Sequence, residues 1–349
     1  MAENPRPTPR RQRDPVARSG QDGRRERRWR RRPRTRTLAI AAVAVIALLA
    51  AALVVRQPAP VGHFTSGPAK TEFAAAYRTA MAELPEPDAV HDLRTDFGVV
   101  RAYHFDGPAD GVPLVLLPGR AAASPVWADN LPSLLRHRDV YTVDLLGEPG
   151  MSLQDRPITS DADQARWLHQ AVRALPEERV HLLGLSIGGW TAVNLAMREP
   201  AGIAGVALVD PVYVFDGMPL ETVVRSVPAS VPWLPRSWRE SFNSYTAGGA
   251  PADDSPQGAL IEAGMRTYAL RLPQPGQIPE ERLAGLRPPV LAVLAGESVM
   301  HDPATAEAAA RRALPDDRVK VYPDASHAIN GEYPEEVAAD VGAFLDAVE

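Results

Sequence analysis

The chain has 349 residues, of which 45% are hydrophobic, enough for one large folded domain with extensions. It contains no cysteine, which excludes disulfides, zinc-thiolate sites and a cysteine nucleophile. Its net charge of −5 is unevenly distributed, because residues 1–36 hold 14 arginines against four acidic residues. We expect neither a metal nor a cofactor, and the sequence leaves the oligomeric state open.

The N-terminal region predicts a membrane protein. Residues 1–36 are rich in Arg and Pro and almost free of apolar side chains, so we expect a disordered basic tail. Residues 38–55 are 18 uncharged apolar residues. As a helix they measure about 27 Å, enough to cross a bilayer. We therefore predict a transmembrane anchor over 37–56, which explains the basic tail more simply than a nucleic-acid partner does.

The charge distribution around this apolar run predicts its orientation. Arginines crowd its N-terminal side, and only Arg56 follows it. The positive-inside rule then gives a single-pass protein of the cell membrane with a cytoplasmic N-terminus and an extracytoplasmic catalytic domain. The alternative is a protein secreted after signal cleavage near residues 50–52. The long basic region and the lack of a clean small-x-small site favour the uncleaved anchor.

Residues 57–68 contain three prolines and two glycines and read as a linker before a domain over 69–349. A helix is predicted over 70–84 and a hairpin over 95–105, around Gly98. Apolar runs then alternate with helical patterns at 160–175 and 304–314, which is typical of a mostly parallel α/β sheet flanked by helices. The expected strands are 113–117, 140–143, 180–183, 203–209, 290–294 and 319–322.

Residues 211–288 interrupt this alternation. The segment has no confident strand but many prolines and large apolar side chains. A structureless loop of this length is rare in a compact domain. We therefore predict a helical lid insertion that packs aromatic residues over the end of the sheet.

The segment Gly184-Leu-Ser-Ile-Gly-Gly189 contains the strongest chemical signal of the chain. It lies between an apolar strand pattern and a helical pattern, the context of a nucleophile elbow. Glycines allow strand and helix to approach closely at so tight a turn, and the helix N-terminus favours developing negative charge. Ser186 is therefore the predicted nucleophile.

An activated serine requires a base and an oxyanion hole. His327 follows the last expected strand, where the base belongs in the Ser…acid…His order. The oxyanion donors are expected to be backbone N–H groups. One comes from Ile187, directly after the nucleophile, and the other from Arg120, in the loop after the first central strand.

Taken together, residues 69–349 resemble the α/β-hydrolase superfamily, close to bacterial serine esterases. The matching segments are the strand and oxyanion loop at 113–121 with Trp127, a D-x-x-G-x-G-x-S-like turn with one added residue at 144–152, the elbow, Gly296-Glu297 and the histidine loop at 327–334. The resemblance implies an α/β-hydrolase fold with a lid. It departs from the family at Pro118, which replaces the histidine of the usual His-Gly pair.

The third triad member departs from the pattern as well. Counting from Gly296 to His327 puts Val299 where the family has an acid. A shifted turn would let Glu297 or Asp302 serve instead. Asp210, at the end of the preceding strand, is the other solution found in the superfamily, and the sequence leaves these three open.

The expected activity is that of a membrane-anchored serine hydrolase that cleaves carboxylic esters, small acyl esters being the expected partners. Serine at the elbow argues against haloalkane dehalogenases and epoxide hydrolases, which use aspartate there. Two alternatives remain open at this point: an acyltransferase that uses the same serine, and a non-hydrolytic binding or sensing domain.

Overall fold

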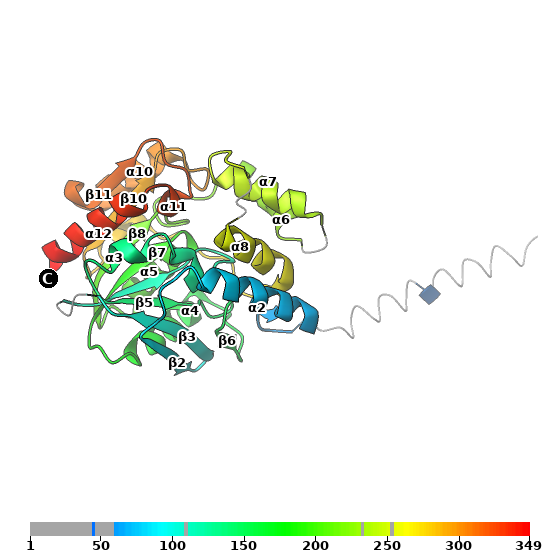
Figure 1. Ribbon diagram of the computed structural model, residues 1–349. Coiled ribbons are helices and arrows are strands. Elements are labelled where there is room, and N and C mark those ends of the chain that lie inside the picture. The colour runs from blue at the N-terminus through cyan, green and yellow to red at the C-terminus, as the bar shows by residue number, and fades with distance from the viewer. Residues whose placement is uncertain (1–43, 46–58, 108–110, 232–233, 252–254) are drawn as a thin grey trace, which may run out of the picture. The chain divides into compact units, whose positions relative to one another are not determined.

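The computed structural model describes residues 44–45, 59–107, 111–231, 234–251 and 255–349 (Figure 1). The predicted basic tail and most of the predicted anchor lie outside these residues. Among the residues described, no helix is both long and apolar enough to span a membrane. Residues 59–349 form one compact unit.

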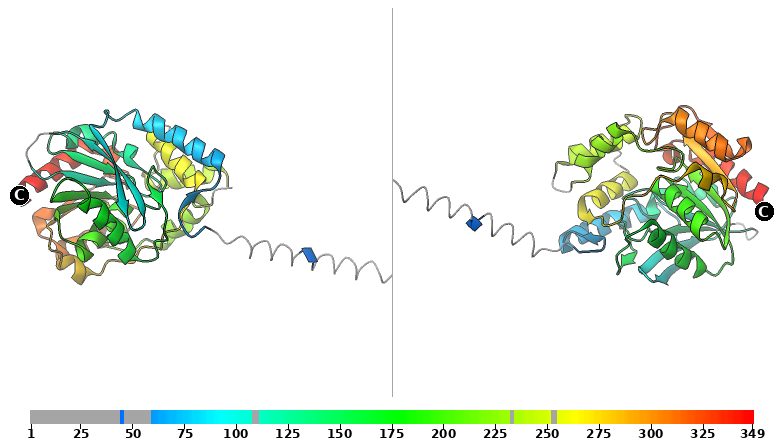
Figure 2. Two further views of the ribbon diagram at one scale, coloured as in Figure 1. Left: turned by 90° about the horizontal axis from the view of Figure 1, so that it is seen from below. Right: turned by 180° about the vertical axis from the view of Figure 1, so that it is seen from behind.

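A nine-stranded sheet forms the centre of this unit (Figures 1 and 2). Its order is β11-β10-β8-β7-β4-β5-β3-β2, with β6 paired to β3. The path from β11 to β5 is parallel, whereas β3 pairs antiparallel with its neighbours. The sheet strands are β2 (Ala89–Thr95), β3 (Gly98–Phe105), β4 (Leu114–Leu117), β5 (Val140–Val143), β6 (Leu153–Gln154), β7 (Val180–Leu185), β8 (Ile203–Val209), β10 (Val290–Ala295) and β11 (Val319–Tyr322).

Helices cover both faces of the sheet. The helices are α2 (Gly67–Met81), α3 (Leu131–Leu134), α4 (Asp161–Arg173), α5 (Ile187–Arg198), α6 (Leu220–Ala229), α7 (Arg236–Thr246), α8 (Pro256–Thr267), α9 (Glu280–Ala284), α10 (Pro303–Ala313), α11 (Ile329–Glu332) and α12 (Pro334–Val348), with 3-10 turns at Ser124–Trp127 and Asp316–Arg318. Every residue of β4, β7, β8 and β10 is buried. Burial on both faces explains why these strands read as continuous apolar runs.

The two faces of the central strands belong to two separate cores. On β8, Val206 and Leu208 pack with α4, α5 and α10, whereas Ala207 and Val209 pack with α2, α3 and α12. This alternation follows from the two-residue repeat of a strand. Because the strands from β11 to β5 are parallel, they all end at one edge of the sheet, and the loops at that edge are free to carry functional side chains.

The structure confirms the predicted α/β-hydrolase architecture, with some shifted boundaries. The first hairpin is β2–β3, so it begins earlier than predicted, and its turn lies before Gly98. Strand β2 (AVHDLRT) has neither a continuous apolar run nor a regular alternation of polar and apolar residues, so the sequence pattern did not reveal it. Helix α2 begins before the predicted start because the Ser66 hydroxyl accepts the Ala69 N–H and caps it.

The described residues of the predicted lid insertion contain the helices α6, α7, α8 and α9. It also holds one short strand, β9 (Tyr268–Ala269), which pairs antiparallel with β1 (His63–Phe64) at the start of the unit. The lid helix α8 lies beside α2 in all views (Figures 1 and 2). Not every aromatic packs inward as expected, since Trp238 on α7 is half exposed.

Candidate active site

Ser186 lies at a tight turn between β7 and α5. Its backbone has φ 55° and ψ −117°, a conformation that costs a non-glycine residue free energy. The flanking glycines have no room for a side chain. A Cβ at Gly184 would lie 2.3 Å from the Gly188 carbonyl oxygen, and one at Gly188 would lie 2.1 Å from the Leu117 carbonyl oxygen. The turn therefore requires glycine at these positions, as the motif predicts.

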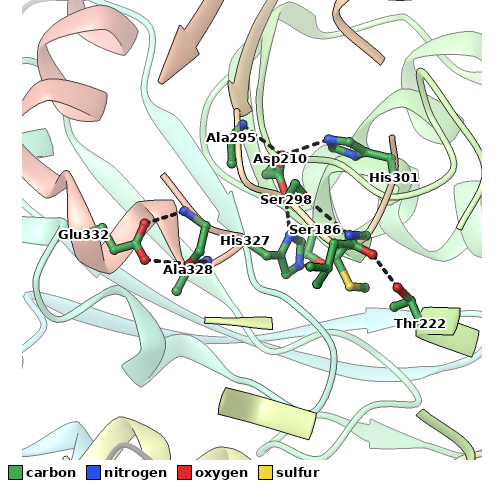
Figure 3. A network of polar contacts seen from close by, with 12 residues as sticks. Ser186, Asp210, Thr222, Ala295, Ser298, His301, His327, Ala328 and Glu332 are labelled. Carbon is green, nitrogen blue, oxygen red and sulfur yellow. Dashed lines mark hydrogen bonds and ion pairs between the residues drawn. The ribbon is translucent and has the colours of Figure 1, made fainter. Parts of the chain in front are cut away.

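A continuous line of side chains extends from this serine (Figure 3). His327 Nε2 lies 2.9 Å from Ser186 Oγ, and His327 Nδ1 lies 2.5 Å from Asp210 Oδ2. The three residues follow β7, β8 and β11, so the edge at which the parallel strands end brings them together. Serine, imidazole and carboxylate in this order are the geometry of an activated nucleophile.

The loop that carries His327 is fixed by its neighbour. The backbone N–H of Ser326 donates to Glu332 at 2.8 Å, and the Ser326 hydroxyl donates to the same carboxylate at 2.6 Å. The Ser326 hydroxyl oxygen also accepts the Ala328 N–H at 3.1 Å. Because Glu332 lies on α11, these bonds tie the histidine loop to the helix that follows it (Figure 3).

Asp210 is fully buried and surrounded by donors. Its carboxylate accepts the Ala295 N–H at 3.1 Å and the Ser298 hydroxyl at 2.7 Å. Its backbone φ of 41° is a left-handed value that aspartate tolerates better than most residues. Burial alone would raise the pKa of Asp210, but contacts with His301 and His327 outweigh burial and hold that pKa well below its usual value. Asp210 is therefore a carboxylate at any neutral pH.

The other two candidate acids lie elsewhere. The side chain of Glu297 is exposed, although its backbone N–H donates to Ala325. Asp302 caps α10 by accepting the Thr305 N–H at 2.8 Å. Val299, which has the family's acid position, accepts a hydrogen bond from Thr222 of α6 through its carbonyl oxygen. Of the three open candidates, only Asp210 contacts His327.

The sequence did not predict the two side chains next to Asp210, Ser298 and His301. Ser298 donates to Asp210, and His301 Nε2 lies 3.3 Å from Asp210 Oδ1, longer than a good hydrogen bond (Figure 3). His301 is 2% exposed. Both residues lie in the loop after β10, where the family pattern has its acid. A histidine within that loop was the available signal, but a single buried histidine is more often structural.

The expected oxyanion loop lies against the nucleophile. A Cβ added to Gly119 would lie 3.6 Å from Ser186 Cβ, so the chain passes next to the serine there. Within the described residues, the backbone N–H groups of Arg120 and Ile187 donate no hydrogen bond. Two backbone donors beside a nucleophile suit a developing oxyanion.

One group of metal-ligand type exists among the described residues: His104, Asp106 and Asp139. Its imidazole nitrogens face the two carboxylates at 3.5 and 3.8 Å. His104 lies in β3, Asp106 follows that strand and Asp139 precedes β5, so the group is at the edge of the sheet opposite Ser186. An imidazole between two carboxylates accounts for this arrangement, and we assign no metal to it.

The chain resembles known hydrolases over most of its length. The sequence model of the alpha/beta hydrolase family matches residues 114–340. The uncharacterized carboxylesterase nap of Bacillus subtilis is 26% identical over 268 residues, which are 73% of this chain and 86% of that protein. The crystal structure of the carboxylesterase CesB (YbfK) of Bacillus subtilis superposes with a TM-score of 0.72 at 23% identity, covering 80% of this chain and 99% of that one.

Proposed function

Because the chain belongs to the alpha/beta hydrolase family, we propose that it cleaves carboxylic esters through an acyl-enzyme on Ser186. The observation that carries this proposal is the continuous contact from Ser186 through His327 to Asp210, at 2.9 and 2.5 Å. The similarity to carboxylesterases supports an ester as the substrate class.

The proposed reaction uses each group at its observed position. Ser186 Oγ attacks the ester carbonyl carbon while His327 Nε2 takes its proton, and the Arg120 and Ile187 N–H groups hold the oxyanion. His327 then gives the proton to the departing alcohol. Water, deprotonated by the same imidazole, releases the carboxylic acid and restores the serine. Asp210 stays ionised throughout and stabilises the imidazolium.

Two alternative functions use the same fold. The non-hydrolytic binding domain depends on the absence of an acid at the family position, and the contact between Asp210 and His327 supports the hydrolase instead. An acyltransferase would use the same acyl-enzyme but pass the acyl group to an alcohol in place of water. Measuring how the product partitions between acid and ester, with methanol added, distinguishes transfer from hydrolysis.

Labelling with a fluorophosphonate is expected to modify Ser186 of the native protein. The probe forms a stable bond only to a serine whose Oγ is activated. Peptide mass analysis should show one modified site, and the heat-denatured protein is the matched control. An unlabelled Ser186, under conditions that label a control esterase, contradicts the proposal. A series of p-nitrophenyl esters of increasing acyl length then defines the preferred chain.

We also propose that the hydrolase domain lies outside the cytoplasmic membrane, anchored through residues 38–55. The asymmetry of arginine around that apolar run supports this orientation. Protease added to intact spheroplasts should digest or release the domain that follows Arg56. Protection of the domain, with digestion only after lysis, contradicts the orientation. Recovery of a shortened protein from the medium before protease treatment indicates a cleaved signal.

A further inference from the structure

The proposed mechanism leaves two buried carboxylates, Asp144 and Glu148, without a role. Glu148 is 2% exposed and lies in the turn after β5, in the segment with one residue more than the family pattern. Burial raises its pKa, against the opposing effects of Arg120 and the Ala121 N–H. Burying an acid costs free energy unless its contacts compensate. Its contacts therefore indicate why it is there.

Both contacts of Glu148 lead to the oxyanion loop. Its Oε2 accepts the backbone N–H of Ala121 at 3.2 Å, and its Oε1 lies 3.2 Å from Nη1 of Arg120. Arg120 supplies one of the two proposed oxyanion donors, and Ala121 is the next residue. Glu148 and Arg120 also line a cavity of about 20 Å³ together with Ile187, the other proposed donor.

The backbone of this loop needs an external restraint. Ala121 has φ 56°, a left-handed value that a residue with a Cβ adopts at a cost. Such a conformation persists only when the surroundings hold it. A carboxylate oxygen on the Ala121 N–H fixes the plane of the peptide group between Arg120 and Ala121. That plane in turn constrains the neighbouring peptide, which carries the Arg120 N–H.

A second buried carboxylate from the same turn acts on the same loop. Asp144 accepts the backbone N–H of Ser124 at 2.8 Å and its hydroxyl at 2.7 Å. It also accepts the Met151 N–H at 2.7 Å, which closes the turn on itself. The oxyanion loop is thus held at Ala121, and the 3-10 turn that follows it is held at Ser124. Glu148 holds the point nearer the proposed donor.

We infer that Glu148 is a positioning residue, which aims the Arg120 N–H at the oxyanion by holding the Ala121 N–H. This inference rests on the proposed hydrolase function. Glu148 does not itself touch the reacting atoms. Its effect should therefore appear in stabilisation of the tetrahedral oxyanion, with little effect on binding of the ester.

Two conservative variants separate the acceptor from the charge. Glu148→Asp keeps the charge but withdraws the oxygen from Ala121, whereas Glu148→Gln keeps an oxygen in reach and removes the charge. We expect Glu148→Asp to lose at least about 10-fold in kcat, and Glu148→Leu on the order of 10²–10³, the range for one oxyanion donor. Glu148→Gln should retain activity within about threefold, because the N–H still has its acceptor.

The decisive measurement is inhibition by an aryl trifluoromethyl ketone. Ser186 Oγ adds to the carbonyl carbon of this inhibitor and forms a tetrahedral oxyanion. Its inhibition constant should rise in Glu148→Asp by the same factor as kcat falls, with KM unchanged. Glu177→Gln, which alters a carboxylate that accepts the Tyr141 hydroxyl, is the matched control and should change neither constant.

The outcomes are distinct from those for the function itself. A wild-type protein that turns over no ester and binds no ketone contradicts the proposed hydrolase. An active wild type with unchanged ketone affinity in Glu148→Asp contradicts the role of Glu148, as does a loss confined to KM. Should Glu148→Leu fail to fold, the contrast between Asp and Gln still decides the matter, since equal effects of the two contradict the role.

Discussion

Replacing Ser186 with alanine is expected to lower kcat for p-nitrophenyl acetate on the order of 10⁶-fold, to the level set by oxyanion stabilisation and substrate positioning alone. The variant loses the atom that attacks the carbonyl, and no other described side chain contacts His327 Nε2. The substitution should leave the backbone of the turn unchanged, because the close approach of strand and helix depends on Gly184 and Gly188. Steady-state kinetics and a thermal unfolding curve measure both effects.

The thermal curve is the control for this variant. Ser186 is 8% exposed, and losing its hydroxyl removes one contact with His327, so the melting temperature should move by only a few degrees. If the fold is intact and activity falls less than about 100-fold, another group acts as the nucleophile and the mechanism is contradicted.

The strands and the nucleophile were predictable because they depend on local patterns. Buried parallel strands are short continuous apolar runs, so their positions follow from the local sequence and from the turn residues that bound them. The elbow is a local turn whose glycines exclude any side chain. His327 follows the last strand by a short loop, so chain order was enough to select it.

The acid was not predictable because its place depends on how strands neighbour one another. Asp210 directly follows β8, which lies between β7 and β10 in the sheet. That order puts Asp210 beside the loop after β10, where the Ser298 hydroxyl donates to its carboxylate and His301 lies 3.3 Å away. The sequence separates Asp210 from His301 by the whole lid, so no local pattern joins them. The contacts of Glu148 with Arg120 and Ala121 were not predictable either, because they depend on β4 and β5 being neighbours in the sheet.

Replacing Asp210 with asparagine is expected to reduce kcat/KM on the order of 10⁴-fold. Asparagine occupies nearly the same volume, but its amide nitrogen is a hydrogen-bond donor. His327 Nδ1 then has to accept a hydrogen bond where it donated one to the carboxylate. The imidazole then adopts the tautomer that presents an N–H to Ser186 and is unable to take its proton. Glu297→Gln is the matched control, since Glu297 is exposed and should change kcat/KM by less than twofold. Equal small effects in both variants would contradict the proposed triad.

The stability of the Asp210→Asn variant gives an independent test through pH. In the folded state the pKa of Asp210 lies below its usual value, so the ionised group stabilises the fold above about pH 4, the unfolded pKa. That stabilisation is lost as pH falls through the folded pKa. The melting temperature of the variant should therefore lie below that of the wild type at pH 7, and the difference should shrink toward pH 2. A difference that does not depend on pH would mean that Asp210 acts through packing alone, and its assignment as the ionised partner of His327 would fail.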